Sequence, residues 1–211
     1  MTPTLRSTTT RSLVRARRGL TLTELLVTLA VFSVIMASAF ASILIYAMEL
    51  VPTRIGLIAG VFFAFSTFVM GALGRLPAPH GIAAMNSINV VVINPWFLGA
   101  FMGTAALCVL LAVAAFMKWP EPDAMLLLIG ALLYFAGTFL VTMIFNVPLN
   151  DALAAVAPDS PAGADLWTRY LSTWTNWNHV RTVAALAASA LLTIALCLQV
   201  RGAGAVAAAT G

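Results

Sequence analysis

Five long stretches with almost no charged residues constrain the fold of this chain more than any other feature. They cover residues 20–47, 55–73, 96–117, 124–145 and 180–200. As helices, they are each long enough to cross about 30 Å of hydrocarbon. The stretches show no strand-like alternation, and a segment in hydrocarbon must satisfy its own backbone hydrogen bonds. The sequence therefore predicts an all-α integral membrane protein, a multi-pass helix bundle that contacts the lipid bilayer.

The charged residues are too few for a water-facing surface. Only 9% of the 211 residues are charged and 62% are hydrophobic, whereas a soluble domain carries about 25% charged residues. Five arginines precede the first apolar stretch, at positions 6, 11, 15, 17 and 18. Arginines in this position are typical of a cytoplasmic anchor. No nucleic-acid partner is predicted, because no folded nucleic-acid-binding module follows the arginines.

No metal site or cofactor is predicted. Cys108 and Cys197 both lie inside apolar stretches, without a neighbouring histidine or acid. The chain has two histidines in all, too few for a multi-histidine centre. Phosphate-binding, zinc, haem and flavin patterns are absent from the sequence.

The predicted organisation has four parts. A basic tail (1–19) precedes an extra N-terminal transmembrane helix (20–47), a four-helix membrane domain (55–200) and a flexible C-terminal tail (201–211). The boundary between the first two apolar stretches is open, since little more than Glu49, Pro52 and Arg54 separates them. A hairpin of two spans is the favoured interpretation, and one long helix kinked at Pro52 is the alternative.

Most remaining polar residues lie in two loops, residues 75–95 and 146–179. Two crossings separate these loops, so they share one side of the membrane. If the arginine tail is cytoplasmic and each of the first two stretches crosses the membrane, both loops are cytoplasmic. If the first two stretches form a single crossing, both loops are external. Each loop is expected to contain a short interfacial helix. In the second loop, Asp159 or Ser160 is a suitable N-cap for a helix that begins at Pro161.

The most polar segment stands at the start of the last stretch. On a helix that begins near residue 175, four of its side chains share one face, namely Trp174, Trp177, Asn178 and Arg181. His179 lies to the side of that face and is suited to proton transfer at neutral pH. An arginine at a helix start is poorly placed for the helix dipole, which favours a bound anion beside it. The alternative is that these residues anchor the helix at the interface.

Two further polar groups open on the same side of the membrane. Asn146 and Asn150 are spaced to share a helix face, and their amides are costly in apolar surroundings unless they are paired. Asn86 and Asn89 precede a run from Asn94 to Phe97 that includes Trp96. The alternative for Asn94 and Asn150 is that each merely caps a helix.

These residues resemble the anthrone oxygenase-like family of small membrane proteins. The similar stretches are residues 56–66, 94–97, 145–150 and 174–182, and the resemblance extends over about residues 55–198. It implies a four-helix membrane protein. Fungal members of the family oxidise polyketide anthrones to anthraquinones with dioxygen and without a recognised cofactor, whereas most bacterial members have no assigned activity.

The N-terminal segment resembles a different family. The run from Arg18 to Glu24 is similar to a prepilin leader, which implies cleavage after Gly19. A pilin has one apolar helix and a soluble head, whereas this chain has several apolar stretches. We interpret the leader as an incidental similarity or an N-terminal extension, and a pilus-related scaffold is a lesser hypothesis.

The leading functional hypothesis is a pocket in a cell-membrane protein that oxidises an anthrone-like aromatic substrate without a cofactor. His179 is the predicted base, and the predicted oxyanion ligands are Arg181, Asn178, Asn146 and Asn150. Trp174 and Trp177 are expected to stack on the substrate, with Asn94 and Trp96 completing the site. The alternative is a non-enzymatic protein that binds or carries a small hydrophobic molecule. The oligomeric state is left open.

Overall fold

The computed structural model describes residues 22–210, and helices are the only regular elements in that range. The described residues belong to two compact units, which divide between Ala41 and Ser42. Four helices in the described range are long and apolar enough to cross a membrane, over Leu22–Leu73, Pro95–Met117, Asp123–Ala154 and Pro161–Gly202. The predicted all-α, multi-pass membrane class is therefore confirmed. The predicted basic tail, residues 1–19, lies outside the described residues.

The first two apolar stretches form one helix. Helix α1 (Leu22–Ala64) passes through Pro52 and continues through the π-helix η1 (Phe65–Val69) into α2 (Met70–Leu73). The favoured hairpin is therefore replaced by the single-helix alternative. A proline removes one backbone hydrogen bond from a helix, whereas a turn in apolar surroundings would leave several backbone groups without partners.

Helix starts follow the capping signals in the sequence. Helix α4 (Pro95–Met117) begins after Asn94, whose side chain accepts a hydrogen bond from the Phe97 amide at 3.0 Å. Helix α7 (Pro161–Thr210) begins after Ser160, whose hydroxyl accepts one from the Gly163 amide at 3.0 Å. Of the two candidates for this N-cap, Asp159 and Ser160, it is Ser160 that makes the capping hydrogen bond. The helix extends to Thr210, over most of the range predicted to be a flexible tail.

The two loops differ in content. The first contains helix α3 (Ala78–Val91), as expected. The second has no separate interfacial helix in the described chain, because α6 (Val147–Ala154) directly follows the preceding π-helix and residues 161–179 belong to α7. Aromatic residues in this part of α7 pack inside the protein and do not lie on the membrane surface, where an interfacial helix would place them. Tyr170 and Trp174 are buried in one cluster with residues of α2, α3 and α6.

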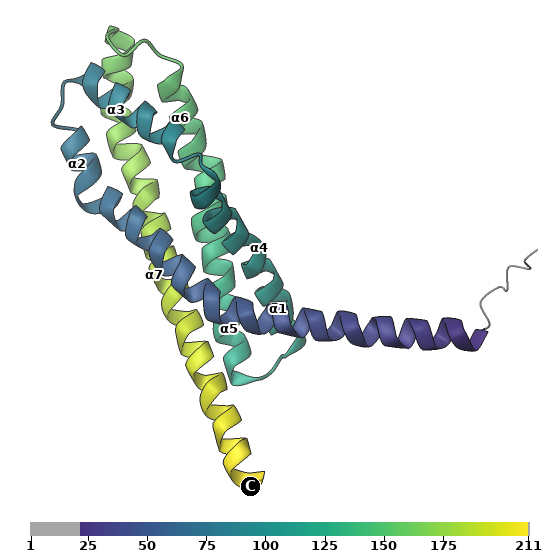
Figure 1. Cartoon of the computed structure of the whole chain (residues 1–211). Helices are drawn as coiled ribbons and strands as arrows, with labels where there is room; N and C mark the ends of the chain where they lie inside the picture. The colour runs from purple at the N-terminus through teal and green to yellow at the C-terminus, as the bar shows by residue number, and fades with distance from the viewer. Residues whose placement is uncertain (1–21, 211) are drawn as a thin grey trace, which may run out of the picture. The chain divides into compact units, whose positions relative to one another are not determined.

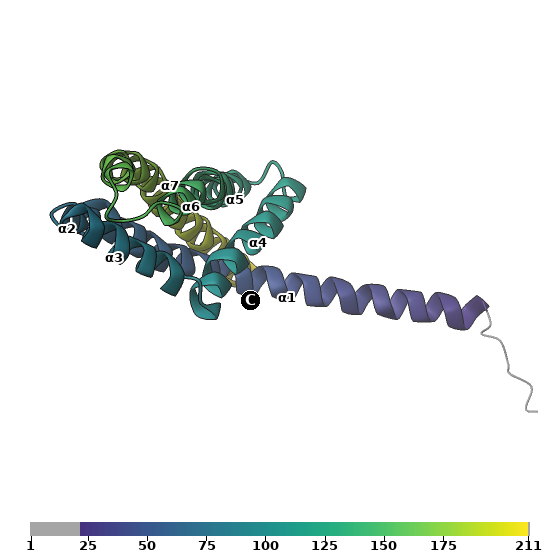
Figure 2. The ribbon, with the colours of Figure 1, turned by 90° about the horizontal axis from the view of Figure 1, so that it is seen from above.

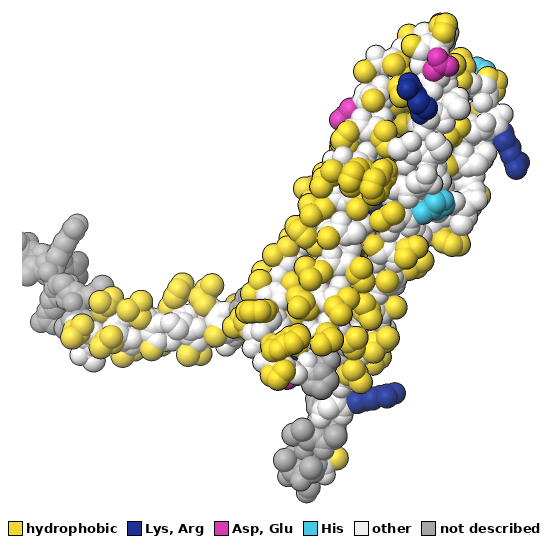
Figure 3. Space-filling view, turned by 180° about the vertical axis from the view of Figure 1, so that it is seen from behind, with side chains coloured by type: hydrophobic (Ala, Val, Ile, Leu, Met, Phe, Trp, Pro, Cys, Tyr) yellow, Lys and Arg dark blue, Asp and Glu magenta, His cyan; other side chains and the backbone are white. Residues whose placement is uncertain are grey.

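The unit formed by residues 42–211 is organised around α7. Helix α5 (Pro122–Leu132) and its π-helical continuation η2 (Leu133–Leu140) lie between α4 and α7, while α3 and α6 pack near the start of α7 (Figures 1 and 2). A second π-helix, η3 (Thr142–Asn146), leads into α6. Hydrophobic side chains cover the middle of this unit, and charged side chains lie near its ends (Figure 3). This pattern is typical of a bundle surrounded by lipid.

Candidate functional site

A cavity of about 670 Å³ lies at the end of the bundle that holds α3 and α6. Its wall comes from α1, η1, α3, α4, η3, α6 and α7. Most of the lining is aliphatic or aromatic, and the aromatic part consists of Phe62, Phe65, Phe97, Phe101 and Trp174. The polar part consists of Asn86, Asn89, Thr142, Asn146, Asn150, Asp151 and Arg181. A largely apolar cavity with a few polar groups is the usual form of a small-molecule site.

The Arg181 guanidinium is the charged centre of the wall. The residue is only 4% exposed. Its Nη1 donates to the Thr142 hydroxyl at 3.1 Å, and its Nη2 donates to Asn178 Oδ1 at 2.7 Å. Its Cζ also lies 4.2 Å from the ring centre of Phe62 and 5.0 Å from that of Trp174. All of these partners are neutral, so the cation lacks a counter-charge among the described residues.

Asn178 does not line the cavity but positions the Arg181 guanidinium. It is fully buried, and its amide nitrogen donates to the Phe62 carbonyl and to the Ser66 hydroxyl, both at 2.7 Å. Its amide oxygen is thereby turned toward the guanidinium. This bridge ties α7 to α1 and η1, and it positions the charge at the cavity wall.

Two asparagines of the η3–α6 segment take different roles. Asn150 Oδ1 accepts hydrogen bonds from the Tyr170 hydroxyl at 2.7 Å and from Trp174 Nε1 at 2.8 Å, which fixes both aromatic side chains. Asn146 is 1% exposed, and its Nδ2 donates to the Trp174 carbonyl at 3.2 Å. Both asparagines therefore bind α7 while they line the cavity.

Several buried polar atoms at the cavity have no hydrogen-bond partner among the described residues. They are Asn86 Oδ1, Asn89 Nδ2, Asn146 Oδ1 and Arg181 Nε. Buried polar groups without partners are uncommon and costly. Because these four belong to residues that line one cavity, their free donors and acceptors favour a ligand with polar groups at its edge.

The structure brings together four of the nine predicted site residues. Arg181, Asn146, Asn150 and Trp174 all line the cavity. Asn178 lies directly behind Arg181 and acts on the site through it.

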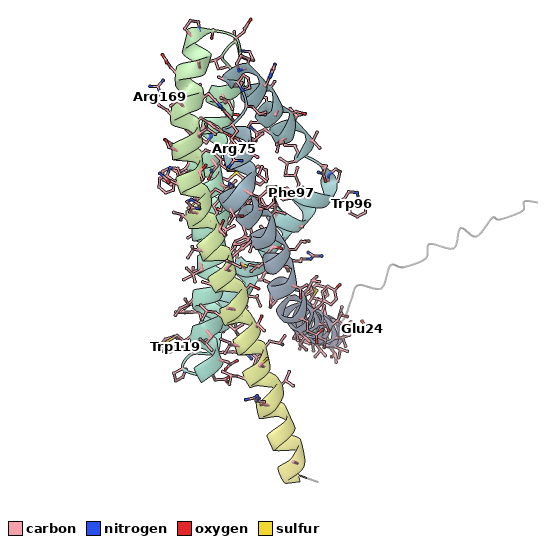
Figure 4. All side chains as sticks on the ribbon, turned by 90° about the vertical axis from the view of Figure 1, so that its left-hand side faces the viewer. Glu24, Arg75, Trp96, Phe97, Trp119 and Arg169 are labelled. Atoms are coloured by element: carbon pink, nitrogen blue, oxygen red, sulfur yellow. The ribbon has the colours of Figure 1, made fainter. Side chains whose placement is uncertain are left out.

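The other predicted residues are placed elsewhere. Trp96 is 89% exposed and points away from the bundle, while its neighbour Phe97 turns inward (Figure 4). Asn94 caps α4, which is its alternative role. The Trp177 ring stacks on Phe145 with ring centres 3.7 Å apart, away from the cavity.

His179 does not reach the cavity either. It is exposed, because about 100° of rotation per helical residue turns it about 200° from Arg181. Its predicted role as the base therefore has no support in the geometry.

Sequence reasoning missed other residues of the wall. Asp151 and Thr142 line the cavity, as do Phe62 and Phe101. Asp151 directly follows Asn150, and this adjacency was the available signal. The two phenylalanines carry no such signal, because their contribution depends on how α1 and α4 meet. In the described part of the chain, no group of three metal-ligating side chains comes together.

Residues 96–191 match the family model of anthrone oxygenase. This match includes α4, η3, α6 and the part of α7 that carries Arg181, so it contains much of the cavity wall. The anthrone oxygenase resemblance noted from residues 94–97, 145–150 and 174–182 is thereby confirmed. The matched region begins at Trp96, so the similar stretch at residues 56–66 lies outside it.

Two further comparisons concern other parts of the chain. Residues 14–40 match the prokaryotic N-terminal methylation motif, which confirms the resemblance to a prepilin leader. A 40-residue part of the chain, 19% of its length, is 60% identical to the fosmidomycin resistance protein of Escherichia coli (strain K12) and covers 10% of that protein. The chain thus matches only a tenth of that relative. No solved structure matches the chain.

Proposed function

We propose that the cavity binds a flat aromatic ketone of the anthrone class and that the protein oxidises it to a quinone with dioxygen. The observation that carries the proposal is the buried Arg181 guanidinium, which faces an aromatic-lined cavity with only neutral partners. Desolvating a cation is costly unless an opposite charge compensates it. A substrate that becomes an anion in the cavity would supply that charge.

The chemistry of an anthrone suits this wall. Loss of a proton from its methylene carbon moves the electron pair to the carbonyl oxygen, and Arg181 would stabilise the resulting oxyanion. This electron-rich anion reacts with dioxygen at the former methylene carbon and gives a hydroperoxide after protonation. Loss of water from the hydroperoxide leaves a second carbonyl group. One oxygen atom of dioxygen ends in the quinone and the other in water, so no external reductant is needed.

The shape of the wall also favours a flat aromatic ligand. Phe62, Phe97, Phe101 and Trp174 offer aromatic faces and edges, which pack well against fused rings. Asn86 Oδ1 and Asn89 Nδ2 offer one free acceptor and one free donor. A ligand of this kind partitions into lipid, so we place the protein in the cell membrane, where the substrate can enter from the bilayer.

The proposal is tested with purified protein in liposomes. Anthrone in air is expected to yield anthraquinone with equimolar oxygen uptake, faster than in empty liposomes. Arg181→Gln removes the charge, and we expect kcat to fall by about 100- to 1,000-fold, the usual effect of losing an oxyanion ligand. Arg169→Gln is the matched control, because Arg169 is an exposed arginine of the same helix (Figure 4).

Arg181→Lys covers the case in which the glutamine variant fails to fold. It keeps the charge but loses the planar hydrogen-bonding fork, so we expect intermediate activity. An oxidation rate for wild-type protein equal to that of empty liposomes contradicts the proposal. Binding of anthrone without turnover would instead support the non-enzymatic alternative, in which the cavity binds or carries a small hydrophobic molecule.

A further inference from the structure

We propose that Asp151 is the base that removes the methylene proton, so that the cavity catalyses keto–enol exchange of its substrate even without oxygen. This inference rests on the proposed function and names the proton acceptor of the same site. With His179 turned away, the cavity needs another group of this kind. Among the described residues that line it, Asp151 and Arg181 are the ones that carry a full charge.

The placement of Asp151 follows from the geometry of α6. Positions 147, 150, 151 and 154 form one face of a helix, and all four residues line the cavity. Asp151 is also exposed, which places its carboxylate at the rim, in contact with both the cavity and the outside. The carboxylate makes no hydrogen bond or ion pair with any described residue, so its lone pairs are free to accept a proton.

The two charges lie on different walls of the cavity, Asp151 on α6 and Arg181 on α7. They form no ion pair with each other, and because both line the cavity, each is available to a ligand inside it. An aspartate base opposite an oxyanion ligand is an established arrangement for enolisation of a ketone. The anion that forms is stabilised by the cation, which offsets the low basicity of a carboxylate.

The step balances without a co-reactant. The methylene C–H bond breaks and an O–H bond forms on Asp151, while the electron pair moves to the substrate oxygen beside Arg181. In the absence of oxygen, the protonated carboxyl exchanges its proton with water at the rim and returns one to the same carbon. In heavy water the methylene hydrogens of the substrate are therefore replaced by deuterium. With oxygen present, the same anion proceeds to the quinone.

The test is anaerobic deuterium exchange of anthrone in heavy water, followed by proton NMR with the full-length protein in liposomes. Wild-type protein is expected to exceed the rate in empty liposomes. Asp151→Asn should lower both exchange and aerobic oxidation by about 100-fold or more, the usual contribution of a general base. Asp151→Glu should recover part of both rates. Asp165→Asn, at an exposed aspartate of α7 outside the cavity, should match wild type.

A binding measurement separates a base from a structural role. Quenching of tryptophan fluorescence by anthrone should give the same affinity for wild type and Asp151→Asn. A variant that loses binding together with exchange would contradict the assignment of Asp151 as the base.

The remaining outcomes distinguish this inference from the proposed function. If Asp151→Asn exchanges and oxidises as fast as wild type, Asp151 is not the base, while the oxidation itself stands. If wild-type protein exchanges deuterium through Asp151 but forms no quinone, the base assignment holds and the oxygenase proposal is wrong. If wild-type protein does neither, both are wrong.

Discussion

The cavity depends on a few buried residues whose polar atoms connect distant helices. Asn178 is the clearest case, because one amide serves three partners. It donates to the Phe62 carbonyl and the Ser66 hydroxyl and accepts from Arg181. The Ser66 hydroxyl in turn lies 3.0 Å from that of Thr182. This arrangement joins two helices and orients the cation at the same time.

Replacement of Asn178 should therefore reduce stability. Asn178→Ala leaves a buried guanidinium and a buried hydroxyl without one partner each, which costs about 1–3 kcal/mol per unsatisfied group. We expect a lower midpoint of thermal unfolding in detergent, measured by circular dichroism. Asn176→Ala is the matched control, since Asn176 is an exposed asparagine of the same helix. Equal midpoints for the two variants would contradict this role of Asn178.

At the scale of elements, the contact between α5–η2 and α7 depends on small residues. A Cβ atom added at Gly137 would lie 2.6 Å from the Ala184 Cβ, and one at Gly130 would lie 2.8 Å from Leu192 Cγ. Small residues let helices approach closely in lipid, where close packing replaces the hydrophobic effect as the main attraction. Gly60 lies between Gly56 and Ala64 in a four-residue repeat of small residues. A Cβ at Gly60 would nevertheless meet no described atom within 4 Å outside its own helix backbone.

This contrast leads to a prediction for the two glycines. Gly137→Ala forces α7 and η2 apart and should lower the free energy of unfolding by about 1–3 kcal/mol, as overpacking does. Gly60→Ala should be neutral or slightly stabilising, because alanine favours a helix more than glycine does. Thermal unfolding of both variants in the same detergent checks this. A larger loss from Gly60→Ala would contradict the packing of α5–η2 on α7.

For the whole molecule, the continuity of α1 with α2 predicts a membrane topology. If Leu22–Leu73 crosses the membrane once, as its length and composition allow, residue 23 and the turn after Met117 are predicted to lie on the same side. The α6–α7 connection then lies on the opposite side. A hairpin at Pro52 would instead place residue 23 on the side of that connection.

Single cysteines introduced into a variant without Cys108 and Cys197 can test this topology. Thr23→Cys and Glu121→Cys should react with a membrane-impermeant maleimide from the same side of sealed vesicles. In the same vesicles, Ala157→Cys should react only after the membrane is opened. In vesicles of the opposite orientation, Ala157→Cys should react first, and the other two variants only after opening. Equal accessibility of positions 23 and 157 would restore the two-span hairpin.

Local features of the sequence were sufficient to predict the fold class and the starts of helices. Long uncharged stretches can satisfy their backbone only as helices in lipid, whatever their neighbours are. The caps at Asn94 and Ser160 are equally local, because each acts on the amide three residues further on. The shared face of Asn178 and Arg181 also follows from helical spacing alone.

Which polar residues meet, in contrast, depends on how the helices pack against one another. Asn86, Asn146, Asp151 and Arg181 come from three parts of the chain, and their convergence depends on the rotation and approach of whole helices. The rotation and approach of the helices are determined by close contacts, such as that of Gly137 with Ala184, which sequence periodicity does not reveal. The same dependence explains why His179 belongs to the most polar segment and yet faces away from the cavity. His179 is one residue, about 100° of helical rotation, from Asn178. The packing of the helices determines which of the two side chains faces inward.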